Sequence, residues 1–183
     1  MKFLKNTKGF TLIELLVVIA VLGTLAVVVL IAINPVQQLA RTRDAGRASS
    51  VTQLGHGIEA YATVNNGVYP VDGAGCALAN VWATNCLVTP GEIQTVPSQV
   101  LYSSLAATPG TCGGVTQNGW CYDATSTAAV VYAAAEATSN TSKCTAGQTG
   151  YYVFSSAAGR GGLWCGAAAP TPGLLGSSTG WVN

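Results

Sequence analysis

The chain has 183 residues, of which 49% are hydrophobic and 8% are charged, and its formal net charge is +1. Its basic residues form no stripe with interleaved aromatic side chains, so we predict no nucleic-acid-binding surface. A single histidine, and six cysteines without a C-x-x-C pair, argue against a zinc site. We therefore predict no metal, no cofactor and no catalytic residue, and nothing in the sequence indicates an enzyme.

The first segment, residues 1–9, is a short basic leader that carries three lysines and no acidic residue: Lys2, Lys5 and Lys8. Such a leader holds positive charge on the cytoplasmic side of a membrane. An ordinary secretory signal is cleaved after its apolar region, whereas the small residue Gly9 lies before it here. Cleavage between Gly9 and Phe10 would keep the apolar region in the mature protein. It would also leave five basic and seven acidic residues, a net charge of −2.

An apolar run from residue 10 to residue 33 follows the leader, and its only polar side chains are Thr11, Glu14 and Thr24. At a rise of about 1.5 Å per residue this run would measure about 36 Å, which spans a hydrocarbon core of about 30 Å. A single segment in lipid can satisfy its backbone hydrogen bonds only as a helix. The sequence therefore predicts a transmembrane helix over residues 10–33.

Glu14 is unusual in this helix, because a carboxylate in a membrane segment costs about 2–3 kcal/mol. One interpretation is an interfacial side chain that points to water or is protonated. The more specific interpretation is an ion pair with the α-amino group of Phe10 on a neighbouring copy, which would offset that cost and set the axial register between subunits. A helix that served only as a tether would need neither the Gly9–Phe10 junction nor Glu14.

The stretch KGFTLIELLVVIAVLGTLAVVVLIAINP closely resembles the leader and first helix of type IV prepilins and type II secretion pseudopilins. The resemblance implies cleavage after Gly9 by a prepilin peptidase/N-methyltransferase and N-methylation of Phe10. It also implies assembly with copies of itself and with other pilins, through the hydrophobic helices and with a role for Glu14. A single-pass protein of the cytoplasmic membrane, with its head outside the cytoplasm, would then become part of an extracytoplasmic or surface filament.

Residues 34–65 continue the helix in amphipathic form, with an apolar stripe at helical spacing made by Val51, Leu54, Ile58 and Tyr61. Pro35 has no backbone N–H and predicts a kink at Asn34. The sequence Asn65–Gly67 predicts the end of the helix.

Three glycines interrupt this amphipathic helix: Gly46, Gly55 and Gly57. Each costs about 1 kcal/mol relative to alanine in a helix interior. They either permit another element to approach closely or mark a weak helix, and the sequence does not distinguish the two.

Residues 66–183 form a head rich in Ala, Gly, Ser and Thr. Apolar and aromatic runs predict strands at 128–135, 150–156 and 162–167, with a hairpin connection between the last two. A long helix followed by short strands predicts an α+β fold, with the helix packed on a small antiparallel sheet.

All six cysteines lie in the head. An even number of cysteines in a translocated domain predicts disulfide bonds and an oxidising compartment. Six cysteines allow 15 connectivities, and the short gaps between neighbours favour the pairs Cys76–Cys86, Cys112–Cys121 and Cys144–Cys165. Each bond typically adds about 2–4 kcal/mol by restricting the unfolded chain.

Two functions remain open from the sequence. The first is a structural subunit of a type IV pilus-like or type II secretion pseudopilus filament. The alternative is a membrane-anchored extracytoplasmic binding module that does not polymerise.

Overall fold

The computed structural model describes residues 9–102, 112–173, 175 and 179–182. Contacts along the chain divide it into two units, Met1–Gln38 and Leu39–Asn183. The first unit contains helix α1. The second contains most of helix α2 together with the sheet, and from here on we call this second unit the head.

Helix α1 spans Leu12–Ile33, and none of its residues is buried. In the described part of the chain it is the one helix that is long and apolar enough to cross a membrane. It ends at Asn34, whose φ of 48° lies in the left-handed region. Helix α2 begins at the next residue, Pro35, because proline suits the first position of a helix, where its missing N–H leaves no hydrogen bond unmade.

Helix α2 spans Pro35–Val64 and buries three of the four residues of the predicted apolar stripe, whereas Tyr61 is partly buried and packs against the same core. Val51, Leu54 and Ile58 are each at most 1% exposed, and they share one core with residues of the sheet. The helix ends in a turn where the Gly67 N–H donates to the Ala62 carbonyl. Gly67 has a φ of 80°, a conformation that glycine adopts without steric cost.

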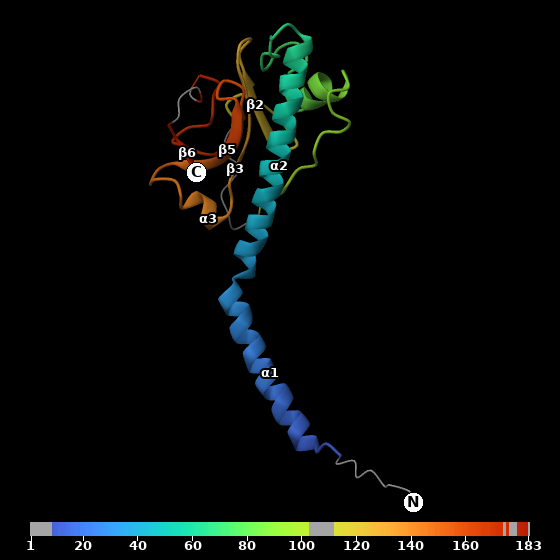
Figure 1. The fold of residues 1–183 in the computed structure, drawn as a ribbon, viewed down its shortest axis with the longest axis vertical. Coiled ribbons are helices and arrows are strands. Elements are labelled where there is room, and N and C mark those ends of the chain that lie inside the picture. The colour runs from blue at the N-terminus through green and yellow to red at the C-terminus, as the bar shows by residue number, and fades with distance from the viewer. Residues whose placement is uncertain (1–8, 103–111, 174, 176–178, 183) are drawn as a thin grey trace, which may run out of the picture. The chain divides into compact units, whose positions relative to one another are not determined.

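The sheet is an antiparallel meander of six strands in the order β1 to β6. The strands are β1 (Val115–Gln117), β2 (Trp120–Ala124), β3 (Ala129–Ala134), β4 (Thr149–Ser155), β5 (Arg160–Gly166) and β6 (Trp181–Val182). Figure 1 shows α2 lying along the sheet, and a four-residue helix, α3 (Thr138–Thr141), lies in the connection between β3 and β4. The predicted α+β class is confirmed, as are the three predicted strands. Strands β1, β2 and β6 were not predicted.

The sheet is covered on both faces, which explains why β3 reads as a continuous apolar run rather than an alternating one. All six residues of β3 are buried. Val131 and Ala133 pack in the core that contains α2, whereas Val130 and Tyr132 pack with Trp164 in a second core on the other face. A strand buried on both sides has no solvent face to carry polar residues.

Gly55 allows α2 to lie close to strand β4. A Cβ atom at Gly55 would overlap the ring of Phe154 and would lie 2.7 Å from the Phe154 Cβ. At Gly57 a Cβ atom would lie 3.2 Å from Ile93, whereas at Gly46 the nearest atom, on Val100, is 3.8 Å away. Close approach is therefore the role of Gly55, while Gly46 has room for a side chain.

Residues between α2 and the sheet cover the core and are held by covalent and polar links. They include the five-residue π-helix η1 (Thr84–Val88), which was not predicted. The Gln117 side chain accepts hydrogen bonds from the N–H groups of Ala83 and Thr84 at 2.8 and 3.1 Å. The structure contains the disulfide bonds Cys76–Cys86, Cys112–Cys121 and Cys144–Cys165, the pairing that the cysteine spacing favours.

Candidate functional site

The start of α1 places Glu14 in a capping box with Thr11. The Glu14 Oε2 atom accepts from the Thr11 N–H at 2.8 Å and from the Thr11 hydroxyl at 2.7 Å. The Glu14 N–H donates to the Thr11 Oγ1 atom at 3.3 Å. This reciprocal pattern satisfies backbone donors that every helix N-terminus leaves free, and it places a negative charge at the positive end of the helix dipole. In a single chain, Thr11 therefore gives the carboxylate a neutral partner.

Gly9 and Phe10 lie immediately before this cap and are exposed, with 76% of the Phe10 surface accessible. Phe10 and Glu14 together line a shallow apolar hollow of about 350 Å³ on the side of the helix. The leader residues 1–8, with Lys2, Lys5 and Lys8, lie outside the described residues. The pairing of Glu14 with the Phe10 amine of another copy involves a second chain and stays a prediction.

The head also contains a buried cluster of charged side chains, which joins α2 to the end of β3. Arg47 donates to Asp44 at 2.8 Å and to Glu136 at 2.9 Å, and the side chains of all three residues are at most 1% exposed. Arg43 donates to the same Glu136 carboxylate, with its Nε atom 3.0 Å from Oε2. This bond to Glu136 raises the pKa of Arg43. Two cations and two anions thus neutralise one another inside the head.

Asp44 also holds the backbone that follows β3. Its carboxylate accepts from the N–H groups of Glu136 and Ala137, both at 2.9 Å, and from the Asn140 side-chain amide at 2.8 Å. Arg47 extends the cluster to the segment before residue 103, because it donates to the Leu101 carbonyl at 3.2 Å and lies 3.7 Å from the centre of the Tyr102 ring. The cluster therefore ties three parts of the chain together at the beginning of α2.

This cluster was not predicted, although two features of the sequence point to it. Arg43 and Arg47 are four residues apart, and Asp44 and Arg47 are three apart, so all three are neighbours on one helix surface. Glu136 directly follows the charge-free run AAVVYAAA. A carboxylate at the end of a buried strand needs a partner, since a buried charge is costly unless it is paired. The sequence alone does not say which cation provides it.

Residues 4–30 match the family model of the prokaryotic N-terminal methylation motif. The chain carries a prepilin-type leader. This leader supports a type IV pilin-like or pseudopilin-like protein that is anchored in a membrane, and it is typical of structural rather than catalytic proteins. Searches of curated proteins and of solved structures gave no match.

The match runs from the leader through most of α1, so it includes Gly9, Phe10, Thr11 and Glu14. It implies processing by a prepilin peptidase and assembly with other pilins. The match ends before α2 and does not include the head.

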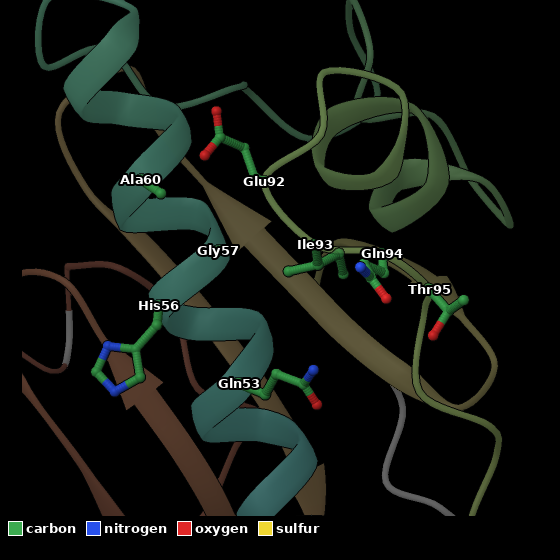
Figure 2. A pocket seen from close by; sticks show the side chains of 8 residues that line it. All are labelled: Gln53, His56, Gly57, Ala60, Glu92, Ile93, Gln94 and Thr95. Atoms are coloured by element: carbon green, nitrogen blue, oxygen red, sulfur yellow. The ribbon is translucent and has the colours of Figure 1, made fainter.

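A groove of about 550 Å³ lies between α2 and residues 92–95. Figure 2 shows Gln53 facing this segment, whereas the His56 imidazole points away from it. His56 instead packs edge-on against Phe154, with the ring centres 5.3 Å apart. Glu92 is the one carboxylate that lines the groove, together with the amides of Gln53 and Gln94 and the hydroxyl of Thr95. In the described part of the chain, no three His, Cys, Asp or Glu residues gather where they could hold a metal ion.

Proposed function

We propose that this chain is a structural subunit of a type IV pilus-like or type II secretion pseudopilus filament. A prepilin peptidase removes residues 1–9, the amine of Phe10 is methylated, and the mature subunits polymerise through α1. The observation that carries this proposal is the methylation motif at residues 4–30, in combination with an apolar helix that keeps a carboxylate four residues after the new N-terminus.

The exposure of α1 supports assembly through this helix. Every residue of α1 is exposed within its own chain, although the helix consists almost entirely of Leu, Ile, Val and Ala. Lipid covers such a surface while the subunit is in the membrane. Outside the membrane, burial against other copies is what removes the apolar surface from water, and this burial is the main driving force for association.

The presence of Glu14 favours a filament subunit over a protein whose helix serves only as a membrane anchor. In a separate subunit the carboxylate bonds to Thr11, which is a neutral partner. In a filament the charged Phe10 amine of an adjacent copy replaces this partner or adds to it. A buried ion pair of this kind sets register, because an axial slip would leave both charges unpaired.

Substitution of Glu14 tests this role. Glu14→Ala should leave membrane insertion and leader cleavage intact, because it makes the segment more apolar and does not alter Gly9. We expect filaments, counted by electron microscopy of sheared cell-surface material, to be lost or sharply reduced, since breaking a buried pair costs about 3–5 kcal/mol at every subunit. Glu14→Gln keeps the size and an acceptor oxygen but removes the charge, and it should give the same defect.

Thr24→Val is the matched control for these variants. Thr24 lies in the same helix, and its hydroxyl donates to the Val21 carbonyl of its own chain at 2.8 Å. This substitution should therefore leave filaments unchanged. If the Glu14 variants and the parent polymerise equally well, Glu14 has no part in assembly. If cells with the parent chain form no filament, the membrane-anchored binding module becomes the better interpretation.

A further inference from the structure

The charges of the head are separated along its length. Seven charged side chains among the described residues of the head make no ion pair within it: Arg41, Lys143, Arg160, Glu59, Asp72, Glu92 and Asp123. Arg41 and Lys143 lie at the end of the head where α2 begins, and the four acids lie toward the end where α2 stops. Arg160, which stacks on Trp181, lies in the same row of the sheet as Asp123, so the second end has four acids and one cation. The buried cluster described above is neutral and does not alter this separation.

Contacts place Arg41 and Lys143 at the first end, which we call the basic end. The Arg41 Nε atom donates to the Ser139 hydroxyl at 3.2 Å, so Arg41 lies beside α3. Lys143 follows α3 by two residues, and Asn140 of α3 is bonded to Asp44 of α2. Figure 1 shows α3 beside the first half of α2. Arg41 and Lys143 are both exposed.

Contacts likewise place the acids at the other end, which we call the acidic end. Glu59 lies in the last turns of α2 and accepts a hydrogen bond at 3.0 Å from the hydroxyl of Tyr69, which follows the end of this helix. Asp72 accepts from the Ala124 N–H at 3.2 Å, so the strand residue Asp123 is near it. Glu92 lines the groove beside Ala60 in the last turns of α2 (Figure 2).

The two ends cannot neutralise each other within one copy. Glu59 follows Arg41 by 18 residues on the same helix, which corresponds to about 27 Å. The Debye length at physiological ionic strength is about 8 Å, so charges this far apart on a surface are screened. A second copy displaced along the direction of α2 brings opposite ends together.

Both ends also expose apolar side chains, as a protein interface requires. At the acidic end Val64 is 72% exposed and Val68 is 48% exposed. At the basic end Leu39 is 60% exposed and Leu101 is 68% exposed. Apolar side chains surrounded by charges of opposite sign on the two surfaces are typical of a specific contact.

We propose that the acidic end of one head binds the basic end of the next copy in the filament. This inference rests on the proposed function. The contact joins two different surfaces of identical chains, and such head-to-tail contacts generate open helical polymers rather than closed dimers. The head therefore contributes to subunit order in addition to the contacts of α1.

Charge reversal in the full-length chain tests the contact. Arg41→Glu with Lys143→Glu makes the basic end acidic, and Glu59→Lys with Glu92→Lys makes the acidic end basic. Each double variant places like charges opposite each other, so we expect about tenfold fewer filaments by electron microscopy. The chain with all four substitutions restores opposite charges, and we expect its filament number to return to within about twofold of the parent.

Two controls accompany the reversals. Arg160→Glu makes the same change in charge at a side chain that stacks on Trp181, outside the basic end, and should not lower filament number. Near-ultraviolet circular dichroism of the full-length variants in detergent should match the parent, because all four substituted side chains are at least partly exposed.

The outcomes separate this inference from the proposed function. Loss with either reversal, and recovery with all four substitutions, supports the contact between heads. If the reversals leave filaments unchanged while Glu14→Ala abolishes them, the contact is overturned and the proposed function stands. Loss without recovery in a folded protein also overturns the contact. If the parent forms no filaments, the proposed function fails and the contact with it.

Discussion

Arg47 shows how a single residue can hold several segments of this head. Arginine is rarely fully buried unless it is paired, and here the Arg47 side chain is 1% exposed. Its burial depends on the carboxylates of Asp44 and Glu136, which pair with the guanidinium group. Removing either side of such a pair leaves a buried charge without compensation.

Arg47→Met should therefore destabilise the head by about 3–5 kcal/mol, because Asp44 and Glu136 would remain buried with less cationic compensation. Arg41→Met is the matched control on the same helix, since Arg41 is exposed and bonds to a serine hydroxyl. Its cost should be below about 1 kcal/mol. Denaturant unfolding of the full-length protein in detergent measures both values. Equal effects of the two substitutions would contradict a supporting role for the cluster.

Asp123 is a residue whose ionisation opposes folding. Partial burial, and the nearby negative charge of Asp72, raise the pKa of the Asp123 carboxyl above its ordinary value. The folded state therefore binds this proton more tightly than the unfolded chain does. This contribution favours the folded state in acid and is lost as the pH rises through the raised pKa.

Asp123→Asn should raise the melting temperature at pH 7, because it removes the ionised carboxylate that the folded state disfavours. The advantage should shrink as the pH falls toward about 3.9, the ordinary pKa of aspartate, and be smallest at about pH 3, where most of the carboxyl is protonated in both states. Thermal unfolding of both chains between pH 3 and pH 7 measures the difference. A difference that does not change with pH would mean that the substituted amide acts through some other contact.

At the scale of elements, the head depends on how closely α2 packs against the sheet. The stripe of Val51, Leu54 and Ile58 supplies the apolar area, but the distance between the elements is set at Gly55. Interiors are packed at high density, so a helix held away from its sheet by a single methyl group loses contacts on both sides.

Gly55→Ala should destabilise the head by about 1–3 kcal/mol, because the added Cβ would overlap the Phe154 ring and force the two elements apart. Gly46→Ala, in the same helix, should instead stabilise the protein by up to about 1 kcal/mol, since its Cβ would meet only Val100 at 3.8 Å. Denaturant unfolding of the two variants distinguishes the predictions. Similar effects at both positions would show that helix propensity, and not close approach, governs Gly55.

At the scale of the whole molecule, the proposed cleavage after Gly9 would change both the charge and the N-terminus. Removal of residues 1–9 would take away three of the eight basic residues and change the net charge from +1 to −2. It would also create the α-amino group that the proposed ion pair with Glu14 requires.

The mature protein should begin at Phe10 with a methyl group on its amine. Intact mass spectrometry and N-terminal sequencing of protein purified from the native membrane check this expectation. Gly9→Leu places a bulky residue at the cleavage site and should leave the leader attached. A mature chain that starts at Met1, or beyond residue 33, would contradict the proposed processing.

Features that depend on neighbours in the chain were determined by the sequence itself. The apolar run that forms α1 and the end of α2 at Asn65–Gly67 follow from local composition and turn residues. The predicted strands correspond to β3, β4 and β5, each at least six residues long. The predicted disulfide pairs join cysteines that are between 9 and 21 residues apart. In all these cases, the partners that decide the structure lie close together in sequence.

Only the tertiary structure decided the remaining features, because their partners lie far apart in sequence. Strands β1 and β6 have three and two residues, too few for any periodic pattern to be visible. Arg47 meets Glu136 across 89 residues, and Gly55 meets a phenylalanine 99 positions later. The sequence shows that a buried charge needs an opposite charge beside it, and that a glycine inside a helix is costly unless close packing requires it. Packing α2 on the sheet brings Glu136 to Arg47 and Phe154 to Gly55, and so provides the opposite charge and the close contact.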